Sequence, residues 1–173
     1  MKKILIIAGQ EFEDIELLYP LYRLREEGFT VHIASYVKEI IGKHGYKIKC
    51  DLLLREVKPE EYVALIIPGG RGPERIRVHA INESNKIIKH FAKNNKPIIA
   101  ICHGPQLLIS ANVIRGRKLT SYPSIRDDLL AAGAEWIDSE VVVDKNIVTA
   151  RIPNDIPSWF KKAIELIKKE SHQ

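Results

Sequence analysis

The amino-acid sequence predicts an α/β protein with a largely parallel central sheet, and three observations carry that prediction. Short, continuous aliphatic runs recur along the chain, as in strands that are buried on both faces of a parallel sheet. Segments with helical spacing of apolar residues alternate with these runs, which is the pattern of right-handed βαβ units. The 173 residues, 45% hydrophobic and 28% charged, suffice for a substantial core. We therefore predict a single domain over residues 1–173.

The first half of the chain contains three of the predicted buried strands and a small hairpin. An aliphatic strand over residues 3–8 is followed by a helix that ends at Gly28 and by a strand over residues 29–35. Alternating apolar and polar residues around two glycines predict a small antiparallel hairpin over residues 40–49. The next buried strand, over residues 63–67, leads through a Gly-rich loop to a helix over residues 74–94 that is interrupted near residues 79–82.

The second half continues the alternation. An apolar run ends in Cys102, and a helix follows to about Asn112. Ser124 is the expected N-cap of a short helix over residues 125–132, which Gly133 closes. A hairpin over residues 140–150 turns at residues 144–146, and an amphipathic helix over residues 156–169 ends the chain.

Charge and cysteine content narrow the class of protein. The net charge of +5 and the pI of about 9.1 would be compatible with binding to nucleic acid. The basic residues are scattered among acidic ones, however, so we expect solvated helix faces and no nucleic-acid partner. Two cysteines without disulfide or metal spacing favour a reducing compartment, and we predict a cytoplasmic location. The N-terminal apolar run is too short for a signal peptide, and no apolar run in the sequence is long enough to cross a membrane.

Cys102 is the candidate nucleophile. It stands between an apolar strand and the Gly104-Pro105 turn that opens the next helix, which is the pattern of a nucleophile elbow. The free N–H groups and dipole of that helix should make the thiol ionise more easily than free cysteine. A small buried cysteine at a strand end is the alternative. The adjacent His103 and the Gly-Pro turn favour the elbow.

Three predicted strands end in residues that suit a functional site. Ligands bind beyond the carboxyl ends of strands in open α/β sheets, and neighbouring strands would bring these ends together. The strand over residues 63–67 ends in Gly69-Gly70-Arg71, and another ends in Cys102-His103. An acidic loop follows the first strand, and a carboxyl group there would share a proton with the thiol and have a raised pKa. Periodicity does not choose among the four acidic candidates, Glu11, Glu13, Asp14 and Glu16.

The Gly-rich loop is not a nucleotide site. Gly69-Gly70 is either a tight turn with positive φ or a backbone that approaches a ligand with its N–H groups. Arg75 stands where the dinucleotide fingerprint requires its last glycine, and no Walker-type lysine follows a glycine run. The six histidines show no metal-ligand spacing. We therefore predict neither a cofactor nor a metal.

Several motifs, in one order along the chain, carry a family resemblance. They resemble those of the PfpI-type intracellular proteases, within the ThiJ/PfpI (Parkinsonism-associated deglycase) superfamily of class I glutamine amidotransferase-like proteins. The resemblance covers nearly the whole chain. The matching segments are residues 11–17, 42–45, 68–75, 100–106, 120–123 and 151–155.

The resemblance implies a fold and a set of roles. The fold would be a flavodoxin-like three-layer sandwich with helices on both faces of the sheet. Cys102 would be the nucleophile, Glu11 the carboxyl group that hydrogen-bonds the thiol, and His103 the imidazole partner. The main-chain N–H groups of Gly70 and His103 would form an oxyanion hole. Arg71 and Tyr122 would line the pocket. Glu74 would orient His103 from a neighbouring subunit, so the protein would be a homo-oligomer.

The proton partner of the thiol bears on the function. Adjacent residues in a tight turn tend to point apart, so we expect His103 to be a weak base for Cys102 and Glu11 to take the proton. The resemblance predicts a cysteine-dependent intracellular hydrolase of peptides. A Cys–Glu pair suits small reactive carbonyls better, so a glyoxalase or protein deglycase acting on methylglyoxal and its adducts is the alternative. A non-enzymatic redox sensor or chaperone is an alternative of another class.

Overall fold

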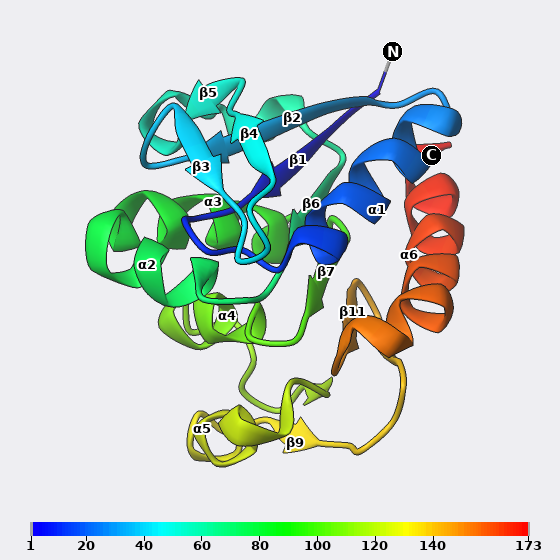
Figure 1. The fold of residues 1–173 in the computed structure, drawn as a ribbon. Helices are drawn as coiled ribbons and strands as arrows, with labels where there is room; N and C mark the ends of the chain where they lie inside the picture. The colour runs from blue at the N-terminus through cyan, green and yellow to red at the C-terminus, as the bar shows by residue number, and fades with distance from the viewer. Residues whose placement is uncertain (1, 173) are drawn as a thin grey trace.

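The computed structural model describes residues 2–172 and contains a seven-stranded sheet covered by helices on both faces (Figure 1). The strand order is β10-β11-β7-β6-β1-β2-β5, and each neighbouring pair is parallel except β10 with β11. In chain order these strands are β1 (Lys3–Ile7), β2 (Thr30–Ser35), β5 (Leu52–Leu53), β6 (Ala64–Ile67), β7 (Ile98–Ile101), β10 (Val142–Asp144) and β11 (Ile147–Ala150).

The helices form the two outer layers. On one face α1 (Asp14–Glu26) and α6 (Ile156–Ser171) pack against the sheet, and on the other face lie α2 (Gly72–His79), α3 (Ile81–Lys93) and α4 (Pro105–Ser110) (Figure 1). Alternate residues of β1 enter different cores: Ile4 and Ile6 face α1 and α6, whereas Leu5 and Ile7 face the other layer. This burial on both faces explains the continuous aliphatic runs and confirms the flavodoxin-like three-layer sandwich.

A small hairpin lies beside the first turn of α1. It consists of β3 (Glu39–Ile41) and β4 (Lys47–Lys49), which pair antiparallel as predicted. The carboxylate of Asp14 accepts hydrogen bonds from the backbone N–H groups of His44 (2.9 Å) and Tyr46 (3.1 Å). The N–H of Lys43 donates to the carbonyl of Phe12 (2.9 Å). The hairpin turn is therefore fixed to the start of α1.

Two local predictions differ in their outcome. The helix interruption near residues 79–82 is confirmed, because α2 ends at His79 and α3 begins at Ile81. The predicted N-cap role of Ser124 is wrong. Pro123 starts a 3-10 turn over Pro123–Ile125, so Ile125 becomes the N-cap of α5 (Arg126–Ala131) and no side chain caps that helix. The hydroxyl of Ser124 is left free of the helix.

The remaining small sheet was not predicted. It joins β8 (Lys118–Leu119) to β9 (Glu135–Trp136) in parallel, next to α5. Two-residue strands carry no periodicity that a sequence pattern could show, and the same holds for β5.

Candidate active site

Cys102 occupies a sharp turn between β7 and α4. Its backbone has a φ of 62°, in the left-handed region that ordinary residues seldom adopt. The turn is held because the N–H of Cys102 donates to the carbonyl of Ala150 (3.0 Å), while its carbonyl accepts from the N–H of Tyr122 (2.9 Å). A Cβ atom on Gly104 would lie 2.6 Å from the carbonyl oxygen of Ile67, so this position requires glycine. The geometry is that of a nucleophile elbow.

The three predicted strand ends do converge. Strands β1, β6 and β7 are adjacent in the sheet, so the loops that follow them meet at one edge. Gly69 lies at the centre: a Cβ atom there would stand 2.7 Å from Cβ of Cys102 and 2.7 Å from Oε1 of Glu16. The absence of a side chain at Gly69 is what lets the thiol residue and this carboxyl group approach each other.

Glu16 is the carboxyl group beside the thiol. It lies in the first turn of α1 and is fully buried. Its Oε1 accepts a hydrogen bond from the N–H of Gly69 (2.7 Å), whereas Oε2 has no hydrogen-bond partner among residues 2–172. Burial, with a smaller contribution from the Glu13 carboxylate, raises the pKa of Glu16 to about 8. The group is therefore mostly protonated at neutral pH.

The expectation that Glu11 faces the thiol is wrong. Glu11 precedes α1 in a left-handed conformation (φ 60°), and its carboxylate pairs with Arg75 and, at 3.6 Å, with Arg71. Two-fifths of this side chain is exposed. Glu16, in contrast, lies on the buried stripe of α1 with Leu17 and Leu21. An acidic residue in phase with an apolar stripe was the sequence signal that could have identified it.

The thiol is not prone to ionise. Backbone N–H groups of Gly70 and His103 hydrogen-bond Cys102 and lower its pKa. Burial outweighs them, and above the pKa of Glu16 the negative charge of that carboxylate adds to the effect, so that the pKa of Cys102 is raised to about 12. The sequence argument from the helix dipole is therefore wrong, because α4 has only six residues and the thiol is 8% exposed beside a carboxyl group. At neutral pH both Cys102 and Glu16 hold a proton.

His103 does meet the thiol, contrary to expectation. Its Nδ1 lies 3.4 Å from Sγ of Cys102, and its Nε2 lies 3.4 Å from Oγ of Ser124. The imidazole ring stacks on Tyr122, with ring centroids 4.9 Å apart and an interplanar angle of 27°. Burial lowers the pKa of His103, and the carboxylate of Glu74 only partly offsets this. The imidazole is therefore mostly neutral at neutral pH and able to accept a proton.

A cavity of about 770 Å³ opens over the thiol. One wall is Glu13, whose buried carboxylate pairs with Nζ of Lys43 and Nε2 of His44, both at 3.1 Å. Glu74 of the same chain also lines the cavity, although the resemblance assigned its role to a neighbouring subunit. Among residues 2–172, the cavity is lined by Glu11, Glu13, Lys43, Gly70, Arg71, Glu74, Cys102, His103, Tyr122 and Pro153.

Two classes of feature are not found within residues 2–172. No group of three or more His, Cys, Asp or Glu side chains is placed to hold a metal ion. No described helix combines the length and apolar character that crossing a bilayer requires. Both cysteines, Cys50 and Cys102, are free thiols.

Comparison with known proteins gives consistent matches. The family model described as the DJ-1/PfpI family matches residues 2–166. A protein of Pyrococcus horikoshii named Deglycase PH1704 is 51% identical over 167 residues, and Deglycase PfpI of Pyrococcus furiosus is 52% identical. In both cases 96% of this chain and 99% of the relative are covered. Among solved structures, oxidized DJ-1 of Toxoplasma gondii matches with a TM-score of 0.85 and 29% identity, over 100% of this chain and 97% of that one.

Proposed function

Because the chain belongs to the DJ-1/PfpI family, we propose that it is a cysteine-dependent deglycase. It would release amines from their adducts with small α-oxoaldehydes such as methylglyoxal. The observation that carries this proposal is the placement of a proton-holding Glu16 and a neutral His103 around one buried thiol. The names of the relatives that are about half identical to this chain support the same activity.

The proposed reaction begins with attack of Cys102 on the carbon that bears the amine. His103 takes the thiol proton at Nδ1 while the S–C bond forms. The C–N bond of the carbinolamine breaks as the S–C bond forms, so the carbon keeps four bonds, and the leaving amine takes a proton from the carboxyl group of Glu16 or from the imidazolium. The product on the enzyme is a thiohemiacetal of the α-oxoaldehyde. A proton shift between its two oxygenated carbons gives a thioester, and water releases a 2-hydroxy acid and restores the thiol.

The backbone around the thiol suits the oxygen atoms of such a substrate. The N–H groups of Gly70 and His103 already point at Sγ, so they are our candidates for holding an oxyanion that develops one bond away. Arg71 and Tyr122 line the approach to the thiol and are the candidates for contacting the rest of the substrate.

A carbonyl substrate fits the site better than a peptide. An amide must have its nitrogen protonated before its C–N bond breaks, whereas a carbinolamine loses its amine readily. Burial lowers the pKa of His103 and outweighs the opposite effect of the Glu74 carboxylate, which disfavours the imidazolium that amide cleavage requires. The peptidase activity that the resemblance predicted is therefore the less favoured outcome of the test below.

One preparation can separate these activities. The loss of methylglyoxal, the release of amine from a methylglyoxal adduct and the cleavage of an unmodified peptide would be measured in parallel. Cys102→Ala is expected to abolish adduct turnover, and Glu16→Gln to reduce it strongly. Adduct turnover that survives in Cys102→Ala would refute the nucleophile, and peptide cleavage without adduct turnover would refute the deglycase.

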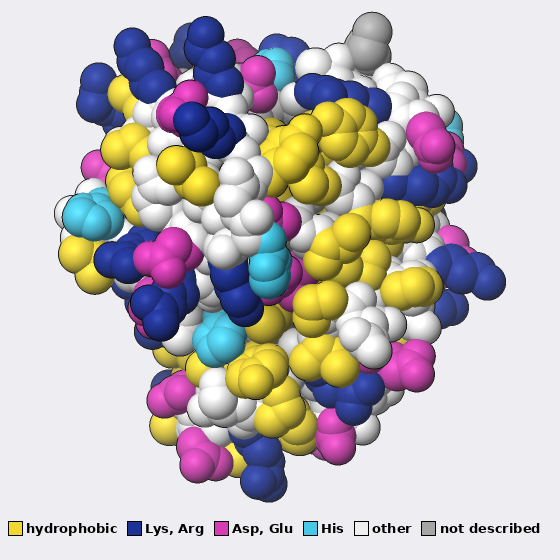
Figure 2. Space-filling view, viewed as in Figure 1, with side chains coloured by type: hydrophobic (Ala, Val, Ile, Leu, Met, Phe, Trp, Pro, Cys, Tyr) yellow, Lys and Arg dark blue, Asp and Glu magenta, His cyan; other side chains and the backbone are white. Residues whose placement is uncertain are grey.

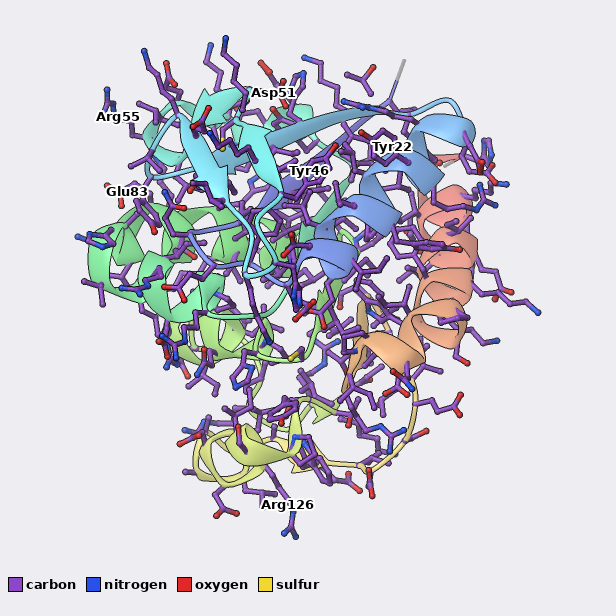
Figure 3. The ribbon with its side chains drawn as sticks, in the orientation of Figure 1. Tyr22, Tyr46, Asp51, Arg55, Glu83 and Arg126 are labelled. Carbon is purple, nitrogen blue, oxygen red and sulfur yellow. The ribbon has the colours of Figure 1, made fainter. Side chains whose placement is uncertain are left out.

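We also propose that the protein works as a homo-oligomer in the reducing cytoplasm. Apolar side chains gather over α1 on the face seen in Figure 2, and Tyr22 of α1 lies beside Tyr46 of the hairpin turn in Figure 3. Ile15, Tyr19, Tyr22 and Tyr46 are between 39% and 51% exposed. Exposed aromatic residues of this density are typical of protein interfaces. The two free thiols are compatible with a reducing compartment.

A further inference from the structure

A relay of hydrogen bonds joins Trp136 to the backbone of the elbow. The indole belongs to the small β8–β9 sheet, which lies next to α5 at one end of the molecule (Figure 1). Its Nε1–H donates to Oγ of Ser121 (3.0 Å), and the Ser121 hydroxyl donates to the carbonyl of Tyr122 (2.9 Å). The N–H of Tyr122 in turn donates to the carbonyl of Cys102 (2.9 Å). Three hydrogen bonds thus lead from β9 to the residue that carries the thiol.

The last bond of this relay acts on the proposed oxyanion hole. The carbonyl of Cys102 and the N–H of His103 belong to one planar peptide unit and point to opposite sides of it. That N–H hydrogen-bonds the thiol sulfur and is one of the two donors that we assign to the oxyanion. Holding the carbonyl therefore sets the direction of the N–H. The left-handed φ of Cys102 (62°) makes such a hold necessary, because a strained conformation persists only where its neighbours fix it.

We propose that Trp136 and Ser121 are positioning residues of this oxyanion hole: they hold the backbone of Tyr122, whose N–H keeps the peptide after Cys102 in its working orientation. An indole nitrogen only donates, so the Ser121 hydroxyl must accept from it and has its single proton left for the Tyr122 carbonyl. The direction of the relay is therefore fixed. The proposal rests on the proposed function, since the oxyanion forms beside the same thiol, and it extends that function to residues next to the small β8–β9 sheet.

The surroundings allow the relay to be broken without unfolding the turn. The carbonyl of Tyr122 also accepts from the N–H of Ile125 (3.1 Å), so we expect the 3-10 turn at Pro123–Ile125 to survive the loss of the hydroxyl. The backbone of Trp136 is held separately, by the pairing of β9 with β8. Ser121 is fully buried, so a bond that is removed there is not readily replaced by one to water.

The test compares Trp136→Phe, Ser121→Ala and the double variant. Phenylalanine keeps an aromatic ring at position 136 and removes the indole N–H. Trp159→Phe is the matched control, because the Trp159 indole is fully buried and its Nε1 has no hydrogen-bond partner among residues 2–172. The same replacement therefore breaks no hydrogen bond there. The readouts are kcat and KM for adduct turnover, and hydrogen exchange at the Tyr122 amide relative to the amides of β7, which needs no substrate.

We expect Trp136→Phe to lower kcat about fivefold at an unchanged KM. The relay loses one ordinary hydrogen bond, and an oxyanion hole acts on the transition state and not on the bound substrate. Relative exchange at the Tyr122 amide should accelerate. Ser121→Ala should lower kcat at least as far, and the double variant no further than Ser121→Ala, since a broken relay has no more to lose. Trp159→Phe should change neither kcat nor the relative exchange.

Four results would overturn the proposal. They are unchanged kcat and exchange in Trp136→Phe, an effect on KM alone, additive losses in the double variant, or an equal loss of kcat in Trp159→Phe. A parent protein without adduct turnover would instead refute the proposed function. The exchange rates of the same set of variants would then still judge whether Trp136 and Ser121 hold the backbone of Tyr122.

Discussion

Replacing Glu16 by glutamine should make the protein more stable at alkaline pH and less active at the same time. Glutamine matches the protonated carboxyl group in shape, and its Oε1 can still accept the hydrogen bond from Gly69. It cannot ionise, so the cost of a buried negative charge disappears. It also cannot pass a proton, so the chemistry proposed for the thiol suffers.

The size of the stability effect follows from the pKa of Glu16. In the folded protein burial raises this pKa from 4.5 to about 8. Between those values the unfolded chain releases the proton and the folded protein keeps it, so the free energy of unfolding falls as pH rises. The contribution of Glu16 is fully present below pH 4.5 and lost as pH passes through about 8. At about 1.36 kcal/mol for each pKa unit, the total is roughly 5 kcal/mol.

The measurement is the free energy of unfolding in denaturant, for the parent and for Glu16→Gln, at several pH values across this range. The two curves should meet at acidic pH and separate as the pH rises, with the variant above the parent. Adduct turnover should fall much further in Glu16→Gln than in Glu11→Gln, whose carboxylate pairs with Arg75 and not with the thiol. Parallel stability curves, separated by a constant difference, would refute the assignment of a protonated Glu16.

Three further predictions concern the thiol, the glycine beside it and the assembly. In a Cys50→Ala background, alkylation of Cys102 should keep accelerating through the alkaline range, because burial and the charge of Glu16 raise the pKa of the thiol to about 12; a plateau near neutral pH would contradict this. Gly69→Ala should abolish turnover and cost about 1–3 kcal/mol of stability, since its Cβ would lie 2.7 Å from Cβ of Cys102; unchanged kinetics would contradict the tight approach. Light scattering should give a mass above that of one 19.7 kDa chain, and Tyr22→Glu should reduce it; a fully active monomer would contradict the proposed oligomer.

The order of strands and helices could be predicted because burial leaves a direct mark on the sequence. Strand residues covered on both faces must be apolar, and residues 4–7 and 64–67 are apolar throughout. The β10–β11 hairpin is marked by its polar turn at residues 144–146. The convergence of three strand ends followed from the general rule for parallel sheets, and the adjacency of β1, β6 and β7 confirms it.

The identity of the carboxyl group is marked less directly. Four acidic residues lie between positions 11 and 16, and each would suit the chemistry. What separates them is their phase with the apolar residues of α1: Glu16 lies on the buried face of the helix with Leu17 and Leu21, while Glu11 remains in the preceding loop. The type of residue alone does not show this difference, because it appears only when each carboxyl group is placed on the helix.

Side-chain direction at the elbow is the other property that the sequence does not carry. The left-handed φ of Cys102 reverses the usual divergence of neighbouring side chains and brings Nδ1 of His103 to 3.4 Å from Sγ. The same turn places a base on one side of the thiol, while Gly69 admits an acid, Glu16, on the other. Burial pushes the pKa of Glu16 up and that of His103 down, so near neutral pH the acid holds a proton and the base lacks one. A thiol that is not ionised at rest is then consistent with catalysis, because its proton can leave during the attack itself.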